Sequence, residues 1–330
     1  MPVSAQEKAR PIFILSTGRA GSTILTWSLG QHPNIIPQEE SNWLGPFAID
    51  AAVGYKRGTL RGERGQLSAN FIERDELLAA LGDAIDRLLV SHRHKFENPD
   101  LRGRAGWALP PFPVSRAENE PKRRWVDGTP EYSLYVCALR KLFPEALFVH
   151  LVRDVADVVR SLLNFRPYGN RLVHTEQEAY EYWLRRARAG VEAERAYGPQ
   201  RVYRMQYADL VTQPDKAMAS LLKYVGEPYA PECLEPLKVR INSSEVGARF
   251  DERDPSTDPE VREQAKLLSV DLLTAPPPRA ADPGTAAKLE ADFDQRVEYF
   301  SALEGRLGEA TDLIRRLQQE GAVIPTPSSG

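Results

Sequence analysis

A buried strand, a glycine-containing turn and a helix follow one another near the N-terminus, and this order restricts the fold more than any other part of the sequence. Residues 11–15 read Pro-Ile-Phe-Ile-Leu, a short apolar run typical of a strand that is buried on both faces. Residues 16–23 contain Gly18 and Gly21 and predict a tight turn. Apolar residues at helical spacing follow until Pro33 ends the pattern. Strand, turn and helix together indicate the start of an α/β unit.

The same alternation continues along the chain. Thr129 and Pro130 predict a helix start, because threonine is a favoured N-cap and proline a favoured first helical residue. That helix is expected to continue to about Pro144. Further strands are expected at residues 125–127, 146–152 and 202–207, and further helices at 158–163, 176–197 and 215–225. The fold class is therefore α/β, with a mostly parallel sheet and helices on both faces.

The chain divides into an α/β domain and a C-terminal extension. The extension is expected to consist of a Pro-rich linker at 275–284, an amphipathic helix at 285–322 and a tail at 323–330, which leaves residues 1–274 for the domain. Within the domain, residues 45–124 are weakly patterned and are expected to form an inserted cap over a binding site, with a loop at 54–65 and a helix at 72–90.

The C-terminal helix carries one apolar stripe, because apolar residues recur every three or four positions from Leu289 to Leu317. Two interpretations fit this stripe. The helix packs back on its own domain, or it pairs with a second copy to form a homodimeric coiled coil.

Composition excludes several classes of protein. The 330 residues include 43 Lys and Arg against 46 Asp and Glu, a net charge of −3, which argues against a nucleic-acid partner. Two cysteines, Cys137 and Cys233, are too few for a disulfide framework or a four-cysteine zinc site. The sequence has no apolar run long enough for a transmembrane segment, and residues 1–10 lack the apolar core of a signal peptide. We expect a cytoplasmic protein without a metal site.

The turn at residues 16–23 is a candidate anion-binding loop. A glycine-rich turn between a strand and a helix directs backbone N–H groups at one point, where the helix N-terminus adds partial positive charge. The loop lacks the Gly-Lys-Ser/Thr of a Walker A motif, since Gly21 directly precedes Ser22, and Arg19 is its cation. A plain strand-to-helix connection is the alternative interpretation.

A second candidate site follows the strand at 146–152. Arg153 stands at the carboxyl end of that strand, where open α/β sheets bind their ligands. Ser161 lies eight residues later, on the same side of the next helix, so the two side chains can bind a phosphate together. A structural role of Arg153 and Asp154 in closing the strand is the alternative.

Together these segments resemble the sulfotransferase superfamily, whose members use 3′-phosphoadenosine-5′-phosphosulfate (PAPS). Residues 17–23 look like its 5′-phosphosulfate loop, and residues 148–154 together with Ser161 look like its 3′-phosphate motif. The resemblance also includes Trp-Val-Asp-Gly-Thr-Pro at 125–130 and Leu-Phe-Pro at 142–144, and it covers roughly residues 11 to 225.

The resemblance implies a P-loop-NTPase-like fold that binds PAPS and needs no metal. It assigns Arg153 and Ser161 to the 3′-phosphate and Tyr207 to a contact with the same nucleotide. It assigns the 5′-phosphosulfate to the loop residues Arg19, Ala20, Gly21, Ser22 and Thr23.

Transfer to a hydroxyl group also requires a base that accepts the proton of the acceptor. The resemblance is strongest to bacterial and tyrosylprotein-sulfotransferase-like enzymes, and their Glu, about 21 residues after the loop Arg, falls on Glu40. A solvated pair of Glu39 and Glu40 is the alternative interpretation. His150 is the rival base, because cytosolic sulfotransferases use a histidine, but its place inside a buried strand favours a structural role.

The sequence departs from the family pattern at Gly128, where tyrosylprotein-type enzymes carry a lysine. Arg19, helix-terminal N–H groups or a later residue must then stabilise the charge of the transition state. Candidates in a late irregular segment are Ser243, Ser244 and Arg249.

The predicted function is transfer of the sulfuryl group from PAPS to a hydroxyl of a small-molecule, carbohydrate or lipid acceptor, with Arg19 and Glu40 as catalytic residues. A P-loop kinase or NTPase and a non-catalytic nucleotide-binding scaffold are the alternatives. The sequence does not identify the acceptor.

Overall fold

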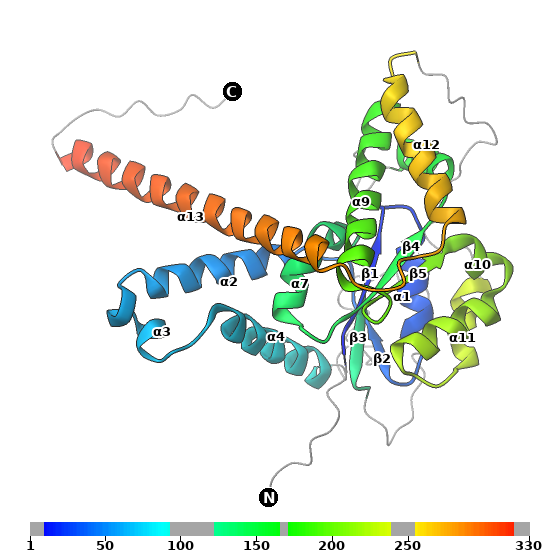
Figure 1. The fold of residues 1–330 in the computed structure, drawn as a ribbon, viewed down its shortest axis with the longest axis horizontal. Coiled ribbons are helices and arrows are strands. Elements are labelled where there is room, and N and C mark those ends of the chain that lie inside the picture. Colours follow the sequence, from blue (N-terminus) through cyan, green and yellow to red (C-terminus); the bar gives the residue numbers. More distant parts are fainter. Residues whose placement is uncertain (1–9, 93–121, 166–170, 239–254, 320–330) are drawn as a thin grey trace, which may run out of the picture.

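The protein folds around a five-stranded parallel sheet, as a computed structural model of the chain shows (Figure 1). The structure describes residues 10–92, 122–165, 171–238 and 255–319. Within these ranges the strand order is β2-β3-β1-β4-β5, and all four strand pairs are parallel. The strands are β1 (Ile12–Ser16), β2 (Ile35–Pro37), β3 (Arg124–Asp127), β4 (Leu147–Val152) and β5 (Val202–Gln206). The expected α/β fold class is therefore confirmed.

Helices connect and cover the strands. The α-helices are α1 (Ser22–Gly30), α2 (Leu44–Thr59), α3 (Gln66–Ala69), α4 (Arg74–Ser91), α7 (Val136–Leu142), α8 (Val155–Asn164), α9 (Glu176–Tyr197), α10 (Tyr207–Thr212), α11 (Pro214–Val225), α12 (Pro259–Thr274) and α13 (Pro283–Gln319). Three 3-10 helices are η1 (Gly62–Arg64), η2 (Pro130–Leu134) and η4 (Pro231–Lys238). In the described part of the chain, none of the helices is both long and apolar enough to span a membrane.

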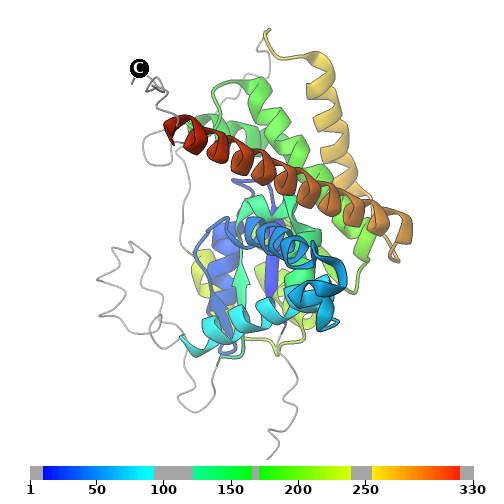
Figure 2. The same cartoon turned by 90° about the vertical axis from the view of Figure 1, so that its left-hand side faces the viewer.

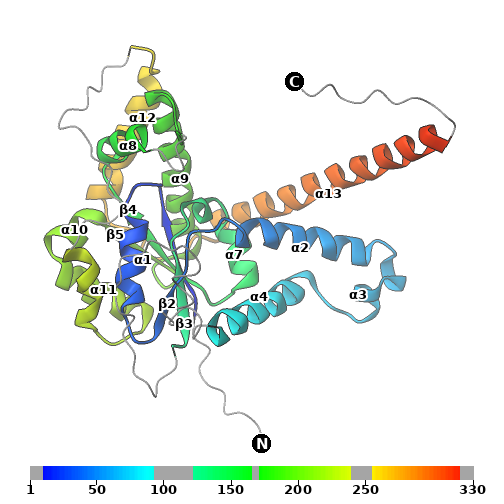
Figure 3. The same ribbon diagram turned by 180° about the vertical axis from the view of Figure 1, so that it is seen from behind.

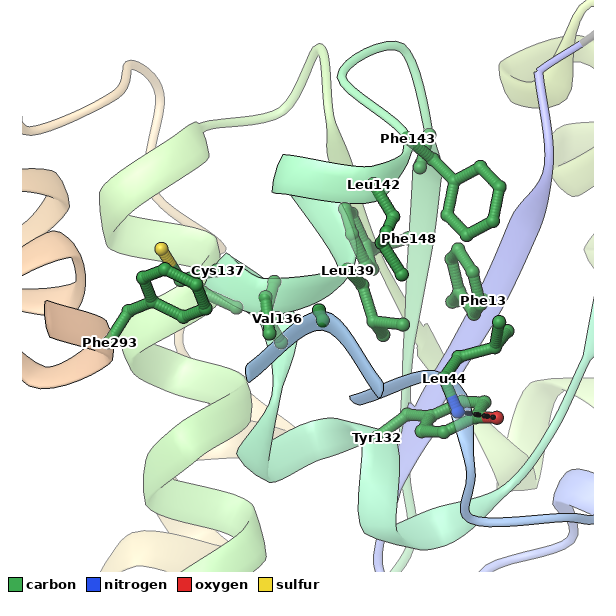
Figure 4. Close-up of a cluster of buried hydrophobic side chains, with 14 of the residues drawn as sticks. Phe13, Leu44, Tyr132, Val136, Cys137, Leu139, Leu142, Phe143, Phe148 and Phe293 are labelled. Carbon is green, nitrogen blue, oxygen red and sulfur yellow. Dashed lines mark hydrogen bonds between the residues drawn. The ribbon is translucent and has the colours of Figure 1, made fainter. Parts of the chain in front are cut away.

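Side chains of β1 alternate between the two faces of the sheet, as the period of two in a strand requires. Ile12 and Ile14 join an apolar cluster with α1 and α11, which lie in front of the sheet in Figure 3. Phe13 and Leu15 join the opposite cluster, which includes residues of α2, α4 and α7. Figure 4 shows this second cluster around Phe13, whose ring contacts Tyr132 at 5.7 Å between centroids. The sheet is therefore buried on both faces. The carboxyl ends of its strands are where open α/β sheets bind their ligands.

Two local predictions were wrong. Residues 54–65 were expected to form a loop, but α2 continues to Thr59, because Ala48, Ile49 and Ala52 bury its inner face in the core. The helix expected from Thr129 to Pro144 is interrupted at Tyr135, where φ is −129° and η2 ends before α7 begins.

The long helix α13 has two halves in different environments. Its first half is packed against α2 and α9, and Phe293 and Val297 are buried there. Figures 1 and 2 show α13 running alongside α2, and ion pairs join Lys56 to Glu298 and Arg57 to Glu304. Its second half leaves its apolar stripe exposed, with Leu303, Leu307 and Ile314 each more than two-fifths accessible. Packing on its own domain therefore describes the first half, and the homodimer stays a prediction.

Candidate active site

The turn at residues 16–23, which we call the anion loop, connects β1 to α1 through two left-handed residues. Arg19 has a φ of 70° and Gly21 a φ of 107°. A Cβ atom at Gly21 would lie 2.6 Å from the Tyr207 ring, so this position needs glycine for space as well as for conformation. Because its N-cap residue Gly21 has no side chain, α1 begins at Ser22 without a side-chain cap from that residue. The N-terminus of α1 is thus a ready anion site.

Arg19 lies where the predicted phosphate-binding residues converge. Its Nε donates to Ser161 Oγ at 3.1 Å, and its guanidinium lies 4.1 Å from the Phe165 ring centroid. Burial lowers the pKa of Arg19 below the usual value for arginine, Glu40 opposes this effect and Arg153 adds to it. Each of these effects is expected of a guanidinium held in a partly enclosed, charged site.

Arg153 approaches the anion loop from the carboxyl end of β4. Its Nη1 donates to Arg19 O at 3.2 Å, and its guanidinium stacks 4.6 Å from the Tyr207 ring centroid. Asp157 Oδ2 lies 3.6 Å from Arg153 Nη2. The buried Nε of Arg153 has no hydrogen-bond partner among the described residues. Arg153, Ser161 and Tyr207 therefore gather around Arg19, and a buried N–H donor remains for a ligand.

Glu40 lies across the loop from this cluster, in the segment between β2 and α2. Thr23 Oγ1, in the first turn of α1, donates to Glu40 Oε1 at 2.9 Å. Although the side chain reaches solvent, the protein around it removes part of its hydration, and this partial burial raises the pKa of Glu40 above 4.5. Thr23 and Arg19 oppose this rise in pKa, whereas the carboxylates of Glu131 and Glu39 add to it. A carboxylate with raised proton affinity therefore faces the anion loop.

Two further residues predicted to bind the 5′-phosphosulfate, Ala20 and Ser22, have buried side chains. Ala20 is fully buried against apolar side chains of α8 and α9. Ser22 is buried at the start of α1, beside Gly128. A Cβ atom at Gly128 would lie 2.3 Å from Thr26 Oγ1, so a lysine at this position would require at least the Thr26 side chain to move.

Two residues of α9 beside the loop were missed in the sequence. Arg186 Nη2 pairs with Glu131 Oε1 at 3.2 Å, and its guanidinium lies 3.5 Å from the Tyr182 ring centroid. Burial raises the pKa of Tyr182 to about 12, and the Gly18 backbone bonds to its hydroxyl. The i, i+4 spacing of an aromatic residue and an arginine was the available signal, but many exposed helices carry such pairs.

His150 does not lie in this site. It is buried in β4, where its Nδ1 and Glu194 Oε1 are 2.6 Å apart. A Cβ atom at Gly190 would lie 2.3 Å from its Nε2, so α9 closes over the other side of the ring. The geometry supports the structural interpretation of His150.

Other predictions lie partly beyond the described ranges. Ser243, Ser244 and Arg249 fall outside the residues that the structure describes, as do the tail at 323–330 and residues 93–121 of the expected cap at 45–124. Among the described residues, no group of three or more His, Cys, Asp or Glu could hold a metal ion.

Comparisons with known proteins give the same family as the resemblance. A family model described as "Sulfotransferase family" matches residues 11–231. An Aquifex aeolicus (strain VF5) protein described as uncharacterized is 25% identical over 236 residues, 70% of this chain and 27% of its own length. The chain thus spans about a quarter of the curated relative that it matches.

Solved structures to which the chain is similar include two sulfotransferases. The sulfotransferase domain of the Synechococcus PCC 7002 olefin synthase is 21% identical with a TM-score of 0.45, over 90% of this chain and 97% of that domain. A sulfotransferase from Alicyclobacillus acidocaldarius is 14% identical with a TM-score of 0.42, over 81% of this chain and 95% of that one.

Proposed function

The chain belongs to the sulfotransferase family, and we propose that it transfers the sulfuryl group of PAPS to a hydroxyl of a small-molecule, carbohydrate or lipid acceptor. The observation that carries this proposal is the placement of two arginines and a carboxylate around one helix N-terminus. Arg19 and Arg153 lie on one side of the anion loop, and Glu40 bonds to Thr23 on the other. Arginines at this position can bind phosphates, and a carboxylate with raised proton affinity can act as a general base.

The residues present fit the nucleotide. The buried Nε of Arg153 is a donor without a partner in the described chain, and a phosphate oxygen is a suitable acceptor for it. Gly21 directly precedes the first-turn N–H groups of α1, where the helix N-terminus favours an anion. In this proposal Arg153 and Ser161 hold the 3′-phosphate, Tyr207 contacts the nucleotide, and the loop holds the 5′-phosphosulfate.

PAPS supplies an activated sulfuryl group on a phosphate leaving group. In the proposed reaction, Glu40 takes the proton of the acceptor hydroxyl as its oxygen bonds to sulfur. The bond from sulfur to the phosphate oxygen breaks in the same in-line step, which leaves a sulfate ester and 3′-phosphoadenosine-5′-phosphate (PAP). Arg19 and the first-turn N–H groups of α1 stabilise the negative charge that develops on the departing phosphate.

We also propose that the protein is located in the cytoplasm. Cys137 and Cys233 are both buried and unpaired, which is consistent with a reducing compartment.

The test is a search for the labelled product. The purified chain is incubated with ³⁵S-labelled PAPS and with panels of sugars, phenols, lipid head groups and fractionated cell extract, and the labelled product is identified. We expect label in a hydroxyl-bearing product, and label formed about 10²-fold more slowly with Glu40→Gln, which should still bind PAP. Tight PAP binding without transfer to any fraction would contradict the proposal and favour a scaffold. Magnesium-dependent ATP turnover would contradict it in favour of a kinase or NTPase.

A further inference from the structure

The segment that carries Glu40 has no regular secondary structure of its own. Residues 38–43, which we call the base segment, connect β2 to α2 outside any helix or strand. An irregular, exposed segment is free to move unless other parts of the chain hold it. A base must be held within a fraction of an ångström of its working position, so the contacts of this segment matter for the proposed reaction.

Two buried side chains, Thr129 at the N-cap of η2 and Tyr132 within η2, hold the base segment. Thr129 Oγ1 accepts a hydrogen bond from Ser41 N at 2.9 Å. Tyr132 Oη donates to Ser41 O at 2.7 Å and accepts from Leu44 N at 3.4 Å; Figure 4 marks the latter bond. Both backbone groups of the residue next to Glu40 are therefore bonded to one short stretch of chain.

Thr129 is itself fixed by Asp127. The Asp127 Oδ1 atom accepts from Thr129 N at 2.9 Å and from Thr129 Oγ1 at 2.7 Å. Both residues are almost completely buried, so loss of a partner would leave a polar group without water. Burial raises the pKa of Asp127 to about 7, but a carboxyl oxygen can accept these bonds in either protonation state.

The same stretch of chain is also bonded to the start of the anion loop. Ser133 Oγ accepts from Ser16 N and donates to Ser16 O, each at 2.9 Å. Gly128 lies against α1, close to Ser22 and Thr26. Residues 127–133 thus touch the loop on one side and the base segment on the other, which fixes the separation between them.

We propose that Thr129 is a positioning residue for Glu40, which it holds against the anion loop through Ser41. The Thr129 hydroxyl donates to Asp127 and accepts from Ser41, so it transmits the fixed position of the buried strand end to the exposed base segment. This inference rests on the proposed function, in which Glu40 is the base.

The experiment compares Thr129→Val, which keeps the shape and removes both hydrogen bonds, with Thr129→Ser, which keeps the hydroxyl. We expect Thr129→Val to lower kcat by about 10²-fold, because displacement of a catalytic group by about 1 Å has effects of this size. The KM for PAPS should stay within about twofold, since the residues assigned to the nucleotide are untouched. Thr129→Ser should restore most of the rate.

A second readout does not depend on activity. Hydrogen–deuterium exchange over residues 38–44 should be faster in Thr129→Val than in wild type and Thr129→Ser, with exchange in β1 and β4 unchanged. Tyr132→Phe, which keeps the ring on Phe13, should change exchange and kcat in the same direction by a smaller factor, and it replaces Thr129→Val if that variant does not fold.

Wild-type kcat together with wild-type exchange in Thr129→Val and Tyr132→Phe would overturn the positioning role. A fall in kcat that Thr129→Ser does not restore would overturn it as well, because the hydroxyl would then not be the cause. If the wild-type chain transfers no sulfuryl group at all, the proposed function fails, while the exchange measurement still decides whether Thr129 holds the segment.

Discussion

The two sides of the anion loop are built in different ways. On the proposed nucleotide side, Arg19, Arg153, Ser161 and Tyr207 come from separate elements and contact one another directly. On the proposed acceptor side, Glu40 stands on an irregular segment whose position depends on hydrogen bonds from β3 and η2. The ends of parallel strands bring the first group together wherever such a sheet forms, whereas the second group depends on a few particular bonds.

The charges of the two sides also differ. Arg153 lowers the pKa of Arg19, as expected of two neighbouring cations. Glu131 and Glu39 raise the pKa of Glu40, as expected of neighbouring carboxylates. We therefore expect substitutions on the nucleotide side to change both PAP affinity and kcat, and substitutions on the acceptor side to change kcat alone. Three substitutions test this contrast.

The largest effect is expected for Arg19→Ala. In the proposed reaction Arg19 belongs to the nucleotide side and also faces the transferring group, so its loss should lower kcat/KM on the order of 10³-fold. PAP affinity, measured by calorimetry, should fall in the same variant. Arg19→Lys is the matched control: it keeps the charge but loses the planar fork, and should recover only part of the rate. Wild-type PAP affinity in Arg19→Ala would contradict the expected difference between the two sides, because Arg19 would then affect kcat alone.

The nucleotide side could be predicted from the sequence because its signals are local. Gly21 and Arg19 fall in a turn directly after an apolar run, and Arg153 directly follows another. Nothing local marks Arg186 as a buried residue of α9, because its partner Glu131 is 55 residues away in the sequence.

Secondary structure follows the same rule. The limits of α9, Glu176–Tyr197, were predicted as observed, since a long amphipathic period and a Thr N-cap mark them. Strand β2 was missed, because three residues that end in a proline show no alternation and acquire their structure by pairing with β3. The hydrogen bonds of Ser41 could not be predicted either, because their partners lie about 90 residues away in the sequence.

The next effect is expected for Glu40→Gln. The amide keeps the shape and can still accept from Thr23, but it cannot take a proton, so kcat should fall by about 10²-fold with PAP affinity unchanged. In the proposed reaction the deprotonated carboxylate is the active form. Activity should therefore be lost as the pH falls through the raised pKa of Glu40, at a pH above the 4.5 of an ordinary glutamate.

Glu39→Gln is the matched control for this pH dependence. The Glu39 carboxylate contributes to the raised pKa of Glu40, so its removal should move the acid limb of the kcat profile to lower pH while the plateau stays near the wild-type rate. An acid limb that persists unchanged in Glu40→Gln would show that another group is the base.

The smallest effect is expected for Ser161→Ala. Ser161 is buried on α8, and its hydroxyl accepts a hydrogen bond from Arg19 Nε. In the proposed complex the same hydroxyl also binds the 3′-phosphate, so PAP affinity should fall by about tenfold, the size of one hydrogen bond to a charged group.

Adenosine 5′-phosphosulfate, which lacks the 3′-phosphate, should bind wild type and Ser161→Ala nearly alike. Asn164→Ala, on the same helix, is the control and should leave both affinities unchanged. Equal losses for the two nucleotides would instead mean that Ser161 acts by orienting Arg19, and the nucleotide side would then depend on internal bonds as much as the acceptor side does.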